Sequence, residues 1–172
     1  MRMDPAGLMW DAPNLAGPDT LDLQSADFAH YGALSRVHAA ERAGGQNLSP
    51  ALTWNPIAQA AQLLLVVEDP DAPTRRPYLH CLAFLDGAVS SLDRGDLSVP
   101  LGHRVQLAVS ALGDGYFGPA PPKTHGPHRY IFQLFALRVP LVVGTGSDPR
   151  SSVAQDADVL ARGRLDGTYQ RG

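Results

Sequence analysis

Apolar runs of strand length recur along the chain and predict a mainly β protein. Residues 63–67 and 80–85 are short apolar runs bounded by turn residues, as in buried strands. Residues 104–109 alternate polar and apolar side chains, so one face of this strand should be wetter than the other. Residues 130–137 are apolar on both faces apart from Gln133, which is typical of a central strand.

A single helix is predicted near the C-terminus. Residues 150–162 carry apolar side chains at helical spacing, at Val153, Ala157 and Leu160. An Asp-Pro pair precedes this segment and Gly163 follows it, as at the ends of many helices. Elsewhere 15 prolines and 17 glycines interrupt the chain and disfavour long helices.

The two parts of the chain differ in composition. Residues 1–24 are rich in proline, glycine and aspartate, which predicts an irregular N-terminal arm. Residues 25–172 hold all the predicted strands and show no internal repeat. Because a chain of 172 residues fits one domain with a substantial core, we expect a single β-rich domain behind the arm.

Charge and cysteine content exclude several classes of protein. The formal net charge of −3 provides no basic surface for nucleic acid or an anionic membrane. The first 20 residues lack a signal-peptide pattern, and no apolar run approaches the length of a membrane span. Cys81 is the only cysteine, which excludes an intrachain disulfide and a multi-thiolate metal site. We therefore expect a cytoplasmic protein without membrane insertion.

The first segment with candidate chemistry is Glu-Asp-Pro-Asp-Ala-Pro at 68–73, directly after a predicted buried strand. Pro70 and Pro73 fix their own φ angles and bias the preceding residues towards extended geometry. Such a loop would hold Asp69 and Asp71 at defined positions at the end of the sheet. The alternative is an ordinary turn built from aspartate and proline.

The second segment, residues 118–130, leads into the strongest predicted strand. Its prolines exclude a helical arrangement of His125 and His128, and Pro127 should stiffen the approach to His128. A stiff loop that delivers a histidine at a strand entrance suits a preorganised site. The alternative is a rigid connector with surface histidines.

His80 opens an apolar run, where a histidine satisfied within the core is the default interpretation. If its strand ended beside Asp71, the two side chains would hydrogen-bond, and the carboxylate would favour the charged imidazole. The chain carries no metal-ligand motif, nucleophile elbow, phosphate loop or dinucleotide fingerprint. We therefore expect neither a metal nor a cofactor.

Taken together, these segments resemble the bacterial branch of the phosphatidylethanolamine-binding protein (PEBP) family, which also includes the Raf kinase inhibitor protein and plant flowering regulators. Asp-Pro-Asp-Ala-Pro at 69–73 is identical to the best-known signature of that family. The other matching stretches follow the family's order and lie at 47–54, 78–80, 118–122, 125–130 and 167–171.

The resemblance implies a PEBP-like fold, with one large antiparallel sheet packed on a smaller sheet and with peripheral helices. It also implies a small pocket that accepts phosphate-like or carboxylate anions and phospholipid head groups. By their positions in the motifs, the side chains that line or support this pocket are Asp69, Asp71, Tyr78, His80, Pro121, His128 and Tyr130. Backbone N–H groups near Gly118 and Ala120 are the implied anion contacts.

This chain departs from the family pattern at one wall of the implied pocket. Bacterial members usually carry a Tyr-x-Cys-Asp-Gly-like stretch where this chain has Arg-Ala-Gly-Gly-Gln at 42–46, and the Ile-Pro pair expected earlier is missing around 33–35. Cys81 stands where the family often has a large aromatic residue. We expect these changes to widen or reshape the pocket.

A pocket with two carboxylates repels an anion unless another group compensates. We expect the compensation from a protonated His80 or His128, or from a proton shared by Asp69 and Asp71. The leading hypothesis is a non-catalytic binding and regulatory protein for a small anionic or organic ligand, with tighter binding at lower pH.

Two other functions stay open. Carboxylates and histidines in one cleft suit metal-free acid–base catalysis, such as cyclisation, isomerisation or elimination of a biosynthetic intermediate. The catalytic residues would then be Asp69, Asp71, His80 and His128. Inhibition of a protease or kinase rests on family analogy alone. A homodimer is compatible with each function.

Overall fold

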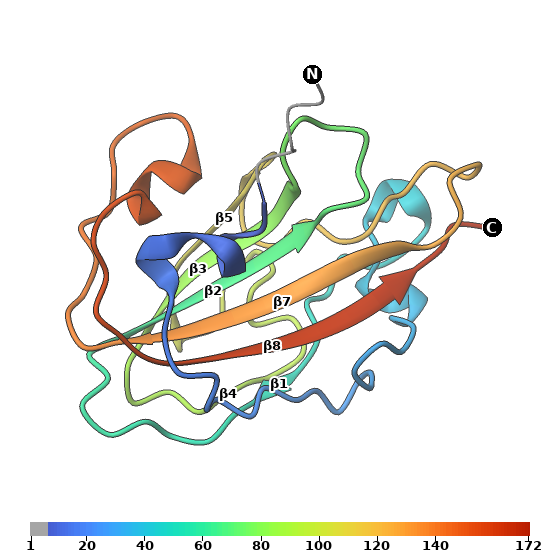
Figure 1. Ribbon diagram of the computed structural model, residues 1–172. Coiled ribbons are helices and arrows are strands. Elements are labelled where there is room, and N and C mark those ends of the chain that lie inside the picture. Colours follow the sequence, from blue (N-terminus) through green and yellow to red (C-terminus); the bar gives the residue numbers. More distant parts are fainter. Residues whose placement is uncertain (1–6) are drawn as a thin grey trace.

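The computed structural model describes residues 7–172 and contains one large and one small antiparallel sheet (Figure 1). The large sheet has six strands in the order β6-β5-β3-β2-β7-β8, and the small sheet pairs β1 with β4. The strands are Leu52–Thr53 (β1), Gln62–Asp69 (β2), Tyr78–Asp86 (β3), Ser91–Leu92 (β4), Val105–Ser110 (β5), Gly113–Asp114 (β6), His128–Leu137 (β7) and Val159–Tyr169 (β8). The predicted mainly β fold with a large and a small sheet is confirmed.

The helical segments in the described part of the chain are short 3-10 turns. They are Met9–Asp11 (η1), Pro13–Leu15 (η2), Arg36–His38 (η3), Glu41–Ala43 (η4) and Pro149–Val153 (η5). Within residues 7–172, no helix has both the length and the apolar character needed to cross a bilayer.

Both faces of the large sheet are covered, which explains the continuous apolar runs in its strands. Along β2, Leu63 and Leu65 point into an inner core shared with Leu52 of the small sheet. Leu64 and Val66 point into an outer core. The four strands predicted from hydrophobic pattern are present as β2, β3, β5 and β7, and β7 lies between β2 and β8 as expected for a central strand.

The C-terminal helix predicted over 150–162 is wrong. Only Pro149–Val153 is helical there, and Val159–Tyr169 forms the edge strand β8, which pairs with the whole of β7. Gly163 lies inside this strand, where a Cβ atom would come 2.3 Å from the Leu21 carbonyl oxygen. Helical spacing is a weak signal, and the long backbone pairing with β7 outweighs it.

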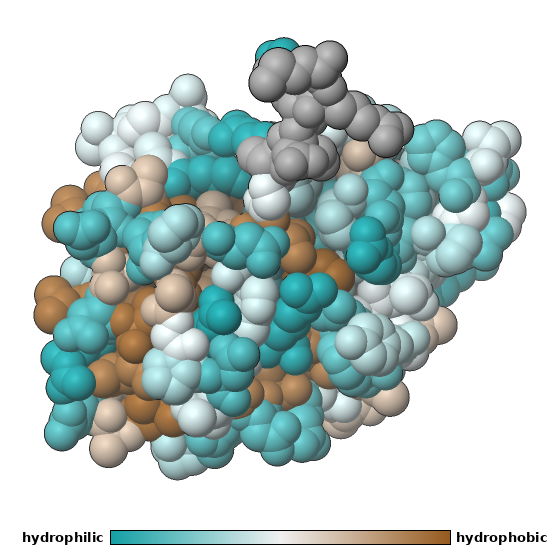
Figure 2. Space-filling view, viewed as in Figure 1, coloured by the Kyte–Doolittle hydropathy of each residue, from teal (hydrophilic) through white to brown (hydrophobic). Residues whose placement is uncertain are grey.

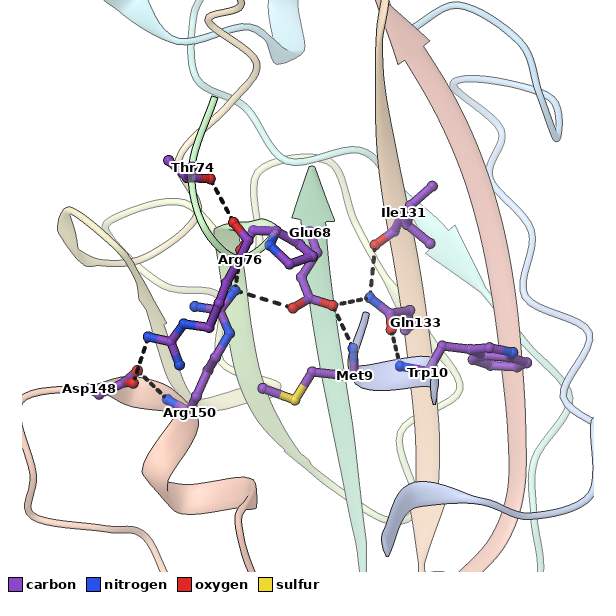
Figure 3. Close-up of polar contacts among 10 residues, drawn as sticks. Met9, Trp10, Glu68, Thr74, Arg76, Ile131, Gln133, Asp148 and Arg150 are labelled. Carbon is purple, nitrogen blue, oxygen red and sulfur yellow. Dashed lines mark hydrogen bonds and ion pairs between the residues drawn. The ribbon is translucent and has the colours of Figure 1, made fainter. Parts of the chain in front are cut away.

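A buried polar network fastens the N-terminal segment and η5 to the outer face of the sheet (Figure 3). The Glu68 carboxylate, 1% exposed, accepts hydrogen bonds from the Met9 N–H and the Gln133 side chain, each at 2.9 Å. Arg150 pairs with the same carboxylate at 3.2 Å. Gln133 in turn accepts the Trp10 N–H at 2.7 Å. Gln133, the exception in the apolar run 130–137, is thus a fixed element of the network.

Apolar side chains also reach the surface. The face viewed in Figure 2 shows brown hydrophobic residues between teal hydrophilic ones. Among the exposed large hydrophobic residues are Val139, Val142 and Val143, in the connection between β7 and η5.

Candidate functional site

Three segments meet at one end of the large sheet: the loop after β2, the loop before β7, and η4 (Figure 1). They enclose a cavity of about 220 Å³. Most of the residues predicted to form a pocket line it, namely Asp69, Tyr78, His80, Ala120, Pro121, His128 and Tyr130. Its remaining walls are Arg42, Ala72, Pro73, Thr74, Phe117 and Pro122. Asp71 and Gly118 are not among the lining residues.

Asp69 and His128 form a buried pair at the cavity wall. Asp69 is the last residue of β2 and His128 the first of β7, and each side chain is less than 5% exposed. His128 Nδ1–H donates to the Asp69 carboxylate at 2.7 Å, which fixes the imidazole tautomer. Burial raises the pKa of Asp69, and the hydrogen bond from His128 opposes this shift. The pair therefore takes up a proton more readily than an exposed aspartate would.

The outer nitrogen of His128 meets a third side chain. His125 Nδ1 lies 3.3 Å from His128 Nε2, and His125 itself is exposed. A chain of polar contacts thus runs from solvent through two imidazoles to the buried Asp69 carboxylate. Both histidines of the second predicted segment take part in it.

Asp71 points to a different partner from the one expected. Arg129 donates to its two carboxylate oxygens at 2.8 and 2.9 Å, and the Arg129 N–H donates at 2.8 Å. These contacts with Arg129 hold the pKa of Asp71 below its usual range. A proton shared between Asp69 and Asp71 is therefore contradicted, because Asp71 is stabilised as an anion and Asp69 is bonded to His128.

The expected hydrogen bond between His80 and Asp71 is also wrong. His80 Nδ1 instead contacts the Phe117 carbonyl oxygen, to which it donates as a neutral imidazole. Burial lowers the pKa of His80 to about 4, so this residue carries no charge at neutral pH. Its ring stacks on Phe117 at 5.7 Å and meets Tyr130 edge-on at 5.0 Å. His80 is thus a neutral wall and not the source of compensating charge.

Gly118 does not line the cavity, but it directly follows the lining residue Phe117 in sequence. Its N–H donates to the Asn47 side-chain oxygen at 2.7 Å, so it is already occupied and is not a free anion contact. A Cβ atom at this position would lie 2.1 Å from the His38 carbonyl oxygen. Asn47 also donates to the Tyr116 carbonyl oxygen at 2.9 Å. The early Asn-x-Ser-Pro motif therefore holds the loop that carries Phe117.

Arg42 lines the cavity and was not predicted as a site residue. Its guanidinium lies 5.0 Å from the centre of the Phe117 ring. The turn that presents it is closed by Gly44, which has a φ of 83°, and by a 2.9 Å hydrogen bond from Arg36 to the Gly44 carbonyl oxygen. The sequence signal was the departure at 42–46, which marked the wall without indicating that an arginine would face the cavity.

Cys81 and Tyr130 differ in their relation to the cavity. Cys81 is fully buried in the inner core and does not line the cavity. The replacement of a large aromatic residue by Cys81 therefore does not alter the cavity surface directly. The Tyr130 hydroxyl is buried at the wall without a hydrogen-bond partner among the described residues. Burial raises the pKa of Tyr130, so its hydroxyl stays protonated and can donate. Within residues 7–172, no three His, Cys, Asp or Glu side chains group as metal ligands.

The chain belongs to the phosphatidylethanolamine-binding protein family, because the family model of that description matches residues 24–170. A UPF0098 protein of Methanothermobacter thermautotrophicus is 32% identical over 80% of this chain and 92% of its own length. LppC of Mycobacterium tuberculosis, named as a lipoprotein, is 39% identical over 73% of this chain. The chain spans 62% of the length of LppC.

Other similarities concern a biosynthetic cluster and the fold. The phomoidride biosynthesis cluster protein B of a fungal species is 32% identical over 69% of this chain and 61% of its own length. A solved PEBP homologue from Chlamydia trachomatis superposes with a TM-score of 0.74 at 26% identity, over 90% of this chain and 99% of that one. YbcL of E. coli has a TM-score of 0.75 at 23% identity, over 88% and 98%, which shows the same fold.

Proposed function

We propose that this protein is a binding module that takes a small anion into the cavity beside Asp69 and His128. The observation that carries the proposal is the convergence of Arg42 and the Asp69–His128 pair on one cavity of about 220 Å³. Family membership supports a binding protein of this kind.

The charges around the cavity are compatible with an anion. Asp71 is neutralised by Arg129, which lies outside the lining, and His80 is uncharged. The negative charge that remains at the wall is that of Asp69, and His128 donates to it. Arg42 supplies positive charge at the same wall. We therefore assign the attraction for an anion to Arg42 and to His128, which was one of the alternatives expected from the sequence, and not to a protonated His80.

Anion binding should be coupled to proton uptake. Because the pKa of Asp69 is raised by burial, the Asp69–His128 pair gains a proton as the pH falls, and an anion beside it favours that protonated state. Affinity should thus increase at lower pH without requiring His80 to titrate.

Calorimetric titration with inorganic phosphate, phosphoethanolamine and acetate tests this function. We expect saturable binding of at least one anion, weakened by about tenfold or more in Arg42→Gln and His128→Ala, since each removes a charge-assisted hydrogen bond. Arg138→Gln is the matched control, because that arginine pairs with Asp158 away from the cavity. Absence of saturable binding by any of these anions would refute the proposal.

A second candidate is an acid–base enzyme. The contact chain from His125 through His128 to Asp69 favours it, because such a chain can carry a proton between solvent and a buried group. The relative from the phomoidride cluster places a related chain beside biosynthetic genes. If the neighbouring genes of this protein encode a biosynthetic route, turnover of that route's intermediate should be lost in Asp69→Asn. Unchanged turnover in that variant would exclude this function.

A further inference from the structure

We infer that the cavity selects a planar, unsaturated carboxylate over a phosphorylated head group, with Arg42 pairing with the carboxylate and the aromatic wall packing on its flat body. This inference rests on the proposed function, which requires only that the cavity takes a small anion. It assigns the class of ligand and identifies Arg42 as the residue that sets specificity.

Backbone N–H donors are scarce along the proline-rich part of the cavity wall. Pro73, Pro121 and Pro122 have no backbone N–H, and the nearby Gly118 N–H is bonded to Asn47. The Thr74 hydroxyl donates to the Arg76 carbonyl oxygen at 2.6 Å. A phosphate group presents three strong acceptor oxygens, each of which needs a donor when it leaves water. The donors that remain at the wall are mainly side chains, among them the Arg42 guanidinium and the Tyr130 hydroxyl, and they suit the two oxygens of one carboxylate better than the three oxygens of a phosphate.

His80 strengthens this discrimination. Because its Nδ1–H is used by the Phe117 carbonyl oxygen and the ring is neutral, Nε2 carries a lone pair and can only accept a hydrogen bond. An acceptor at the wall repels the oxygens of a phosphate dianion. The same nitrogen can contact the edge of an aromatic ligand, because the hydrogens along that edge are weakly positive.

Arg42 fits a carboxylate in charge and geometry. Its guanidinium forms no ion pair with any residue in 7–172 and lies over the Phe117 ring. The planar fork of a guanidinium matches the two oxygens of one carboxylate. Since no carboxylate of the described residues occupies that fork, the fork remains available to a ligand.

The rest of the wall fits a flat body. Tyr78, His80, Phe117 and Tyr130 present rings to the cavity, and the three prolines add rigid apolar surface. Aromatic rings pack favourably on other flat π systems in offset or edge-on arrangements. A cavity of about 150 Å³ accommodates benzene in other proteins, and the cavity here measures about 220 Å³. A six-membered ring with one carboxylate therefore fits.

Calorimetry with four probes at one pH tests the inference: benzoate, its saturated counterpart cyclohexanecarboxylate, the neutral benzyl alcohol, and phosphoethanolamine. We expect benzoate to bind at least about tenfold more tightly than each of the other three, since one charged pair or one aromatic contact is worth about a factor of ten. Arg42→Gln should remove the preference of benzoate over benzyl alcohol. Phe117→Leu should remove its preference over cyclohexanecarboxylate.

Controls separate this inference from the proposed function. Arg138→Gln should bind benzoate as the unmodified protein does, and thermal unfolding should verify that Arg42→Gln, whose side chain is exposed, folds normally. If phosphoethanolamine binds more tightly than benzoate, or if Arg42→Gln leaves benzoate affinity unchanged, the inference is overturned while anion binding stands. If no anion binds, the proposed function itself fails.

Discussion

Removal of the Arg150 side chain should destabilise the protein far more than removal of a surface arginine. Glu68 lies on β2 with 1% of its side chain exposed, and Arg150 is the cation that pairs with it (Figure 3). In Arg150→Met the carboxylate keeps the Met9 N–H and the Gln133 amide but loses its countercharge. Loss of one partner of a buried pair costs about 3–5 kcal/mol, and the two remaining donors place the expected cost near ~3 kcal/mol.

The assay is urea or thermal unfolding of matched variants. For a chain of this length, ~3 kcal/mol corresponds to a fall of roughly 6–12 °C in Tm. Arg138→Met is the control, because its ion pair with Asp158 is about half exposed on both sides and should contribute at most ~1 kcal/mol. The double variant Glu68→Gln, Arg150→Met should recover part of the loss, since no buried charge is then unpaired. Equal Tm values for the two single arginine variants would refute the reasoning.

Three further predictions follow from single residues. Burial lowers the pKa of His80 to about 4, so below about pH 6.5 the unfolded chain binds more protons than the folded chain. The free energy of unfolding should therefore fall by up to ~3 kcal/mol as the pH drops from about 6.5 towards 4. Urea unfolding should show a flatter pH dependence in His80→Leu, and an unchanged profile would contradict this. Gly163→Ala forces a Cβ atom against the Leu21 carbonyl oxygen and should lower the free energy of unfolding by about 1–3 kcal/mol, as measured with a chemical denaturant. An unchanged free energy would mean that the N-terminal segment does not cross β8 so closely. In Gly118→Ala the added Cβ meets the His38 carbonyl oxygen in the same way. This clash should displace the neighbouring Phe117 ring from the cavity wall and lower the affinity for benzoate. Full affinity in a normally folded variant would argue against Phe117 as part of the site.

Strands buried on both faces were predictable because their signal is local. The runs in β2, β3 and β7 are apolar on successive residues, and the sheet is covered on both sides. β8 was missed because its first residues alternate between buried and partly buried, and because Val153, Ala157 and Leu160, which lead into it, have helical spacing. What makes it a strand is its pairing with β7, which no short window of sequence contains.

The site could be predicted only in its residue types. The motifs marked Asp69, Asp71, His80 and His128, and the structure brings most of the marked set to one cavity. Their partners depend on contacts distant in sequence: His128 reaches back 59 residues to Asp69, and His80 reaches forward 37 residues to the Phe117 carbonyl oxygen. Burial then sets which groups are charged, and burial is a property of the assembled fold.

The most direct test of the account follows the side-chain NMR signals of His80, His128 and Tyr78 while benzoate is added at neutral pH. We expect saturable shifts of these three residues, with a dissociation constant that rises about tenfold or more in Arg42→Gln and is unchanged in Arg138→Gln. Shifts that fail to saturate, that arise away from the cavity, or that are the same in both variants would contradict the claim that Arg42 and the Asp69–His128 pair form an anion site.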